Sequence, residues 1–343
     1  MSISALQDYT FVSKYARYLP GQKRRETWSE AVERVRDMHI KKYPQITDEI
    51  TWAFEQVKQK RVLGSQRALQ FGGEPILKKN ARIYNCIASY CDRLRFFQEC
   101  FWLLLCGCGT GFSVQKHHVA KLPSFSPVCK QRGRKVYVIP DSIEGWADSL
   151  GVLLSSYLEG GDFPEYAGYE VVFDYSLIRP EGAPLKSSSG KAPGPAPLQR
   201  AMEKIREVLD RCVAAGQTKL RPIDAYDIVM HASDAVLSGG VRRSATICLF
   251  SPDDQEMATA KIGNWFVENP QRGRSNNSAL LIRGKTTKEE FQKLMGYVRD
   301  CGEPGFVWSD STELVVNPCV EIGLYPVDID TGERSEEHTS ELQ

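Results

Sequence analysis

The sequence predicts an α/β protein in which a helical region precedes a layer or barrel of alternating strands and helices. Over residues 28–69, apolar residues recur at near-helical spacing among many charged ones. After about residue 75 the pattern changes to short apolar segments bounded by glycine, proline and serine, which alternate with longer amphipathic stretches. Strands that alternate with helices are typical of α/β layers and barrels, so we expect such a fold after this boundary.

Apolar periodicity and the breakers that flank it place the individual elements. In the first region Pro44 separates two helices, and Gly72 and Gly73 end the region. Beyond it, the periodicity predicts helices at 93–106, 143–158, 197–215, 222–236 and 288–301. It predicts strands at 111–115, 135–139, 169–174, 245–249, 277–282 and 305–308. Residues 179–197 are rich in proline, glycine and serine and are expected to form a loop.

Composition excludes several classes of protein. Of the 343 residues, 42% are hydrophobic and 25% are charged, which is typical of globular rather than disordered or fibrous chains. The 44 Lys and Arg residues nearly cancel the 43 Asp and Glu residues, so we expect neither a nucleic-acid polymer nor a membrane as partner. The longest apolar run, 101–106, is too short to span a bilayer, and the N-terminus does not have the pattern of a signal peptide. We therefore expect a cytoplasmic protein.

The chain has ten cysteines, which in the cytoplasm are expected to be reduced thiols. Cys86 lies in a strand-like piece before a helix, where a thiol can point into a barrel or cleft, so it is a candidate redox residue. For Cys91, Cys100 and Cys106 the pattern favours buried packing. Cys106 and Cys108 are too closely spaced for a usual pair of zinc ligands, and we assign no metal site.

The pattern with the sharpest chemistry is Asn-Pro-Cys-Val-Glu at 317–321. In an extended segment side chains alternate, so Asn317, Cys319 and Glu321 would share one face. A thiol between an amide and a carboxylate suits a reaction in which sulfur abstracts a hydrogen atom, the carboxylate takes a proton and the amide orients a substrate hydroxyl. The alternative is a buried cysteine at a strand end with solvated polar neighbours, and the pattern alone leaves both open.

Three further segments have glycines or caps that could bind a nucleotide. Residues 107–111 contain three glycines, but they follow a helix and open a strand, the reverse of a dinucleotide-binding loop, so tight helix-to-strand turning accounts for them better. In 238–245 two glycines precede paired arginines, which could bind phosphates or base edges or could form a solvated surface turn. Asp141 or Ser142 could be an ordinary helix N-cap, or a cap whose carboxylate also binds a ribose hydroxyl.

Taken together, these motifs resemble the catalytic chain of ribonucleotide reductases, and most closely the adenosylcobalamin-dependent (class II) ribonucleoside-triphosphate reductases. The matching stretches lie in collinear order at 85–86, 107–113, 141–146, 179–197, 238–245, 269–278, 302–306 and 317–321. The resemblance implies part of a ten-stranded α/β barrel built from two five-stranded halves, with a radical cysteine on a central finger loop. It also implies ribonucleoside triphosphates as substrates, adenosylcobalamin as cofactor, a thioredoxin-like reductant and a deoxynucleoside triphosphate as allosteric effector.

The resemblance also assigns roles to individual residues by position. Cys319 corresponds to the thiyl-radical residue that takes the 3′ hydrogen of the ribose, Glu321 to the base on the 3′-hydroxyl and Asn317 to its hydrogen-bonding partner. Cys86 corresponds to one thiol of the pair that reduces the 2′ position. The effector-binding and specificity residues that it implies are Asp141, Ser142, Arg179, Lys186, Gly240 and Arg242, with Arg242 as the relay arginine between effector and substrate.

The chain departs from the family pattern at its C-terminal end. Residues 322–333 contain no cysteine, although the family has its second redox cysteine in this region, and 334–343 look like a translated sequencing adapter. We therefore expect a helical region at 1–75, the first part of the catalytic barrel at 76–333 and a non-native tail at 334–343, together an N-terminal fragment that is inactive alone. The alternatives are a metal-dependent ribonucleoside-diphosphate reductase and a nucleotide-binding regulatory module without catalysis.

Overall fold

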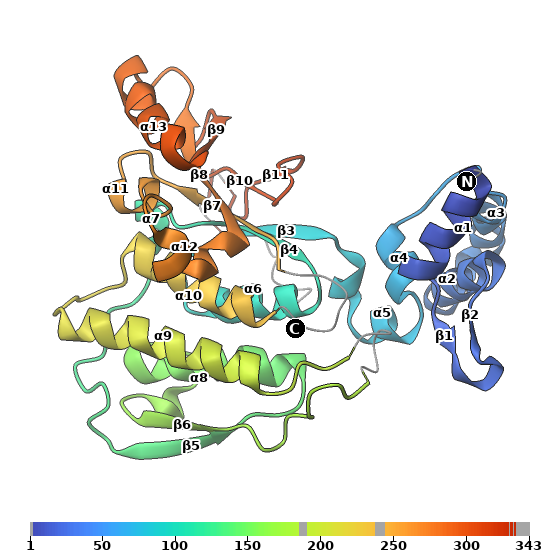
Figure 1. The fold of residues 1–343 in the computed structure, drawn as a ribbon, viewed down its shortest axis with the longest axis horizontal. Coiled ribbons are helices and arrows are strands. Elements are labelled where there is room, and N and C mark those ends of the chain that lie inside the picture. The colour runs from blue at the N-terminus through green and yellow to red at the C-terminus, as the bar shows by residue number, and fades with distance from the viewer. Residues whose placement is uncertain (1–2, 185–190, 237–243, 329, 332, 334–343) are drawn as a thin grey trace. The chain divides into compact units, whose positions relative to one another are not determined.

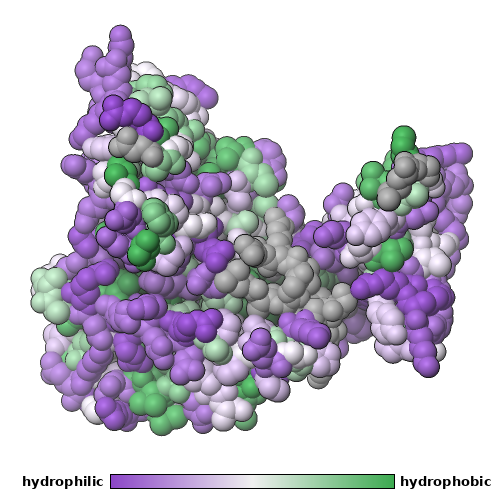
Figure 2. All heavy atoms as spheres, viewed as in Figure 1, coloured by the Kyte–Doolittle hydropathy of each residue, from purple (hydrophilic) through white to green (hydrophobic). Residues whose placement is uncertain are grey.

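The computed structural model describes residues 3–184, 191–236, 244–328, 330–331 and 333 (Figure 1). The chain divides into two compact units, one formed by residues 1–85 with 184–191 and the other by 86–183 with 192–343. In the described residues, none of the helices combines the length and the apolar character needed to cross a membrane. On the face seen in Figure 2, hydrophobic residues form patches that hydrophilic residues interrupt.

The first unit is mainly helical, as the periodicity predicts. Its elements are α1 (Ile3–Lys14), β1 (Tyr18–Leu19), β2 (Arg24–Arg25), α2 (Trp28–Lys42), α3 (Thr47–Lys58), α4 (Gln66–Phe71) and α5 (Glu74–Lys78). A capping box begins α2, in which the Thr27 hydroxyl accepts from the Glu30 N–H and the Glu30 carboxylate accepts from the Thr27 N–H. The break at Pro44 is a short 3₁₀ turn, Pro44–Ile46. Helix α1 was not predicted, and it buries no residue, so it has no core-facing stripe to detect.

The second unit is built on a parallel sheet of five strands in the order β3-β4-β7-β8-β9. These strands are β3 (Cys86–Tyr90), β4 (Gly109–Ser113), β7 (Thr246–Phe250), β8 (Ser275–Ile282) and β9 (Gly305–Ser309). Helix α6 (Arg95–Leu105) connects β3 to β4, and α13 (Lys288–Cys301) connects β8 to β9. The predicted α/β class is thereby confirmed, and the sheet is consistent with one half of the barrel that the resemblance implies.

Helices cover one face of this sheet in two layers. Helix α6 contacts β4 and α10 (Pro222–Ala235), and these pack on α8 (Ile143–Tyr157) and α9 (Ala196–Ala214) (Figure 1). The shared core includes Phe112 and Cys248 from the strands and Phe101 and Tyr226 from the helices, all fully buried. All five helices predicted beyond the first region are confirmed within a few residues.

A second, smaller sheet lies beyond α8. Strand β5 (Arg134–Val138) pairs in parallel with β6 (Glu170–Asp174), and α8, which connects them, contacts β6. Both strands were predicted, but they form a sheet of their own rather than part of the main one. The remaining short elements are α7 (Lys116–Val119), α11 (Gln255–Ala258), α12 (Trp265–Glu268), η3 (Asn80–Ile83), η4 (Pro164–Tyr166) and η5 (Pro270–Arg274).

A C-terminal hairpin covers part of the other face of the main sheet. Its strands β10 (Val315–Val316) and β11 (Gly323–Leu324) are antiparallel, and residues 317–322 connect them. Val315 and Val316 are buried against a separate apolar cluster that the strands contribute, formed by Ala88, Tyr90, Ile247, Leu249, Leu280 and Val307. The sheet therefore separates a helix-covered face from a hairpin-covered face.

Candidate active site

The hairpin passes directly over β4 at two glycines. A Cβ atom added to Gly111 would lie 1.7 Å from the main-chain oxygen of Val316, and one added to Gly109 would lie 3.1 Å from Cγ of Pro318. Only glycine leaves room for this approach at Gly111. The sequence suggested that all three glycines of 107–111 allow a tight turn from helix to strand. This explanation is correct only for Gly107, whose φ is 90°. The other two are strand residues that admit the hairpin.

The same crossing brings Cys86 close to the segment that bears Cys319. Cys86 begins β3 in register with Gly109 of β4. Its Sγ would lie 3.2 Å from a Cβ atom on Gly109, the position that Pro318 approaches to 3.1 Å. Cys86 is half-buried and Cys319 is exposed. Cys86 and Pro318, the neighbour of Cys319, thus approach the same glycine, although they lie at opposite ends of the sequence of the second unit.

The connection 317–322 is a tight turn, and the prediction that 317–321 is extended is wrong. The Val320 N–H donates to the Asn317 carbonyl (2.9 Å), and Val320 has a positive φ of 65°. The chain must reverse here because β10 and β11 are antiparallel. The Asn-Pro pair at the start of the segment is a turn signal that the alternation argument passed over. The three side chains do not share a face by strand periodicity: Asn317 is buried, whereas Cys319 and Glu321 are exposed.

Asn317 closes this turn with two hydrogen bonds, and its side-chain Nδ2 is a further hydrogen-bond donor. Its Oδ1 accepts from the Ile322 N–H (3.0 Å), and its main-chain N–H donates to the Ile322 carbonyl (3.3 Å). The side chain is 1% exposed, and its Nδ2 has no hydrogen-bond partner among the described residues. A buried amide donor without a partner is costly, so such a group is typical of a binding site.

The hairpin is also fixed at its beginning by contacts that the sequence did not reveal. The Gln115 side-chain amide donates to the Thr312 carbonyl (2.7 Å), and the Tyr90 hydroxyl donates to the Glu313 carbonyl. Gln115 follows β4 and Tyr90 ends β3. Both anchors thus come from the C-terminal ends of the strands over which the hairpin lies. No short sequence pattern links residues so far apart in the chain.

A second pair of predicted residues meets in the layer around α8. The Arg179 guanidinium Nε lies 2.8 Å from Oδ2 of Asp141, and both side chains are about one third exposed. Ser142 is the N-cap of α8, because its hydroxyl accepts from the Gly145 N–H (3.0 Å). The capping alternative is therefore confirmed for Ser142, and Asp141 is an ion-pair partner instead. The other predicted effector and specificity residues, Lys186, Gly240 and Arg242, lie outside the described residues.

Comparison with known proteins finds similarity to one family. A family model described as "B12-dependent ribonucleotide reductase, insertion domain" matches residues 121–209, which hold β5, α8, β6 and most of α9. The probable adenosylcobalamin-dependent ribonucleoside-triphosphate reductase of Dictyostelium discoideum is 32% identical over 180 residues, 51% of this chain and 22% of that protein. The adenosylcobalamin-dependent ribonucleoside-triphosphate reductase of Lactobacillus leichmannii is 27% identical over an alignment that covers 92% of this chain and 52% of that protein. The chain is thus similar to B12-dependent ribonucleotide reductases over most of its length, and residues 121–209 match the model of their insertion domain.

Solved structures support the same fold. The crystal structure of a B12-dependent (class II) ribonucleotide reductase matches with a TM-score of 0.78 at 23% identity, and the match covers 92% of this chain and 53% of that one. The chain spans about half the length of the Lactobacillus relative and of this structure. The five-stranded sheet is therefore consistent with part of the larger fold that the resemblance implies.

The three cysteines for which the sequence favours packing are buried. Cys91, Cys100 and Cys106 are each at most 2% exposed, as expected. Burial raises the pKa of Cys100 to about 12 and raises the pKa of Cys91 well above its usual range. The thiols of Cys91 and Cys100 therefore stay protonated near neutral pH.

Proposed function

We propose that the chain is the N-terminal part of an adenosylcobalamin-dependent reductase that converts ribonucleoside triphosphates to 2′-deoxyribonucleoside triphosphates for DNA synthesis. The observation that carries the proposal is the meeting of Cys86 and the Cys319 turn over Gly109. A radical reduction of ribose requires two thiols in one site: one sulfur to take a hydrogen atom and another to supply reducing equivalents. The relatives' names supply the substrate class.

In this reaction Cys319 acts as a thiyl radical that takes the 3′ hydrogen, so an S–H bond forms as the C–H bond breaks. The bound cofactor, adenosylcobalamin, supplies the radical by homolysis of its Co–C bond. The exposed Cys319 thiol fits this role, because a radical generator must reach the sulfur from outside the hairpin. The resemblance implies that the cobalamin site lies mostly outside this chain.

Glu321 and Asn317 act on the 3′-hydroxyl. Glu321 is exposed beside the turn and takes the hydroxyl proton as general base. The unpartnered Nδ2 of Asn317 donates a hydrogen bond to the hydroxyl oxygen, while its Oδ1 keeps the turn closed through Ile322. Substrate binding would then satisfy the one buried donor that the turn leaves open.

Cys86 reduces the 2′ position as water leaves, in a pair with a second cysteine beyond this chain. The resulting disulfide is reduced by a thioredoxin-like partner. In the insertion domain, Asp141 binds the ribose of a deoxynucleoside triphosphate effector, and Arg179, which now pairs with Asp141, exchanges that contact for the effector. Lys186, Gly240 and Arg242 complete the specificity loops. The protein acts in the cytoplasm.

The test uses the full-length product of the source gene, because this chain covers about half of its relatives' length. Cys319→Ala is expected to abolish deoxynucleotide formation and Co–C bond cleavage, while binding of a deoxynucleoside triphosphate is retained. Cys301→Ala is the matched control: Cys301 is also exposed but lies at the end of α13, so turnover should not change.

Two outcomes would favour the alternatives. If the Cys319→Ala variant keeps its turnover, Cys319 is not the radical residue, and the nucleotide-binding module becomes the favoured alternative. Turnover without Co–C bond cleavage, with a preference for diphosphates and a requirement for a second subunit, would identify the metal-dependent class instead. Deoxynucleotide formation by the 343-residue chain alone would contradict the proposal that it is an inactive part.

A further inference from the structure

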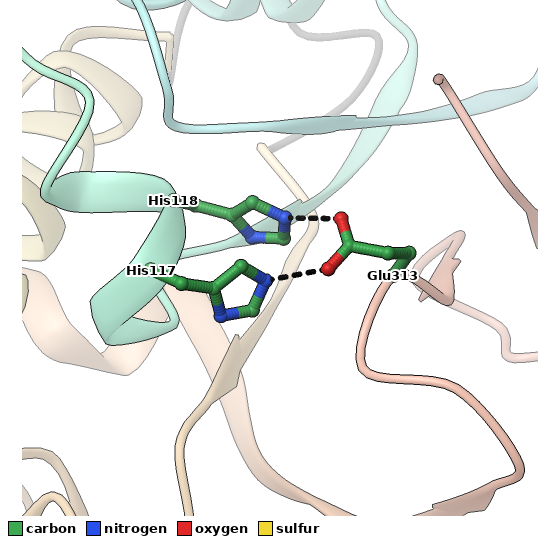
Figure 3. Close-up of side chains that lie close together, drawn as sticks. All are labelled: His117, His118 and Glu313. Atoms are coloured by element: carbon green, nitrogen blue, oxygen red, sulfur yellow. Dashed lines mark hydrogen bonds and ion pairs between the residues drawn. The ribbon is translucent and has the colours of Figure 1, made fainter. Parts of the chain in front are cut away.

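Two histidines and a glutamate converge beside the hairpin, outside the residues assigned to the reaction. His117 and His118 lie on α7, just after β4, and Glu313 lies in the segment that leads into β10. Figure 3 shows both imidazoles directed at the same carboxylate: His117 Nε2 lies 2.8 Å from Oε1 and His118 Nε2 lies 3.1 Å from Oε2. The three candidate ligand atoms all lie within 4.8 Å of one another, and no other group among the described residues has this geometry.

The cluster is held in place by groups that do not belong to it. His118 is fully buried and stacks on Tyr90, with ring centroids 3.9 Å apart. Its Nδ1 lies 2.9 Å from the Ser113 hydroxyl, which fixes the ring and directs Nε2 at Glu313. The Tyr90 hydroxyl also holds the Glu313 carbonyl. Histidines that bind metals almost always have such a partner on the second ring nitrogen.

The cluster is open on one side. The side chains of His117 and Glu313 are 40% and 31% exposed, so an ion and a water molecule can reach the carboxylate from solvent. The nearest lysine in sequence, Lys116, pairs with Asp253 (2.7 Å). Its charge is therefore matched by a carboxylate that is not part of the cluster.

The donor set matches a transition metal with borderline ligand preference. Two imidazole nitrogens and a carboxylate are a usual three-residue set for Zn²⁺, with water in the fourth position. Bonds of about 2.0–2.1 Å at tetrahedral angles place ligand atoms about 3.3 Å apart. The two nitrogen–oxygen distances of 2.8 and 3.1 Å thus need to open by only a few tenths of an ångström, and each imidazole must give up the Nε2 proton of its hydrogen bond, to Nδ1 or to solvent.

We propose that His117, His118 and Glu313 form a Zn²⁺ site that ties the base of the hairpin to the end of β4. Glu313 is two residues before β10, so the ion would fix the segment that carries Cys319 to the sheet. The cluster as it stands is already joined by imidazole–carboxylate hydrogen bonds, and zinc would replace these with coordinate bonds. The proposal does not depend on the reductase activity, because it concerns metal binding by this chain itself.

The test is a Zn²⁺ titration of the purified 343-residue chain after chelator treatment, in competition with a chromophoric chelator. We expect one tight site per chain, with affinity at least tenfold lower in Glu313→Gln and His117→Ala. These two residues are partly exposed, so the variants should fold, which far-UV circular dichroism checks. His118→Ala is less informative because its ring is fully buried. His39→Gln and Glu289→Gln are matched controls on other helices and should bind as the parent chain does.

Co²⁺ separates this site from adventitious binding by the ten cysteines. A site of nitrogen and oxygen ligands gives visible ligand-field bands without the near-ultraviolet thiolate band that cysteine ligation produces. Loss of the visible bands in Glu313→Gln supports the proposal. Two results would overturn it: no stoichiometric binding, or binding with thiolate character that neither variant weakens. The cluster would then be a hydrogen-bonded anchor only.

Discussion

The two faces of the five-stranded sheet differ in what covers them and in the side chains that they present. On the helix-covered face, β4 presents Phe112, which packs with Phe96 and other large side chains of the core. On the hairpin-covered face, the same strand presents Gly109 and Gly111, which leave room for a main chain. Neighbouring residues of one strand therefore serve different purposes, because alternation directs them to opposite faces. The larger buried core lies on the helix side, and the turn that bears Cys319 lies on the hairpin side.

The largest effect on folding is expected from the helix-covered face. Phe112→Ala removes a ring that is 0% exposed, and truncation of a buried phenylalanine costs about 3–5 kcal/mol. The free energy of unfolding in urea, followed by far-UV circular dichroism, measures this loss. Trp52→Ala is the control, because Trp52 is 69% exposed and its removal should change the stability little. Equal losses in the two variants would show that the helix-covered face is not the main source of stability.

The next effect tests the hairpin-covered face. Gly111→Ala places a methyl group where the Val316 carbonyl now lies, so the hairpin must move away. We expect a destabilisation of about 1–3 kcal/mol from this overpacking, and faster proteolysis within 313–324. Gly296→Ala is the matched control: this glycine lies within α13 with no atom near its Cβ position, so alanine should stabilise by up to about 1 kcal/mol.

The proteolysis pattern distinguishes the two faces. Phe112→Ala should speed cleavage throughout the second unit, because it lowers the stability of its core. Gly111→Ala should speed cleavage in the hairpin first. In a full-length enzyme it should also reduce turnover far more than it lowers the melting temperature, since Cys319 moves with the hairpin. Cleavage that begins elsewhere in Gly111→Ala would mean that the hairpin is not held by its fit over β4.

The same two faces show what could be predicted from the sequence and what could not. Apolar runs and flanking breakers located strands β4 to β9 to within a few residues, because strands in the core form short apolar runs. They could not show that Gly109 and Gly111 admit a second main chain, because that approach comes from residues about two hundred positions later. Strand periodicity was also applied across Pro318, where the chain turns. The resemblance assigns the proposed roles of Cys86 and Cys319, whereas the structure shows that Cys86 and Pro318, the neighbour of Cys319, approach the same glycine.

The contact between His118 and Glu313 had no sequence signal either. The two residues are 195 positions apart, and the pair of histidines alone is as typical of a polar helix end as of a metal site. Only the fold brings them together, because the segment after β9, which contains Glu313, runs past the end of β4, where His118 lies on α7. Long-range polar contacts of this kind are specified by the whole topology rather than by any local pattern.

The smallest effect is a pH dependence of stability that belongs to the helix side. The pKa of His231 in α10 is lowered, mainly by burial and to a smaller extent by the nearby charge of Lys204. Three nearby carboxylates, those of Asp227, Asp234 and Glu207, oppose this shift. The folded state therefore holds fewer protons than the unfolded state once the pH falls below the ordinary histidine pKa of about 6.5. The stabilisation is complete above that pH and is lost as the pH falls toward the lower folded-state pKa.

His231→Gln removes this titration. In urea unfolding at pH 7.5 and pH 5.5, we expect the variant to lose less stability between the two pH values than the parent chain. His39→Gln is the control in the first unit, which should keep the parent's pH dependence. If His231→Gln and the parent lose the same stability on acidification, the acid sensitivity of the helix layer comes from other groups, and the imidazole of His231 is charged as easily in the folded chain as in the unfolded one. The helix side would then contribute packing energy alone, without a titrating group that distinguishes folded from unfolded chains.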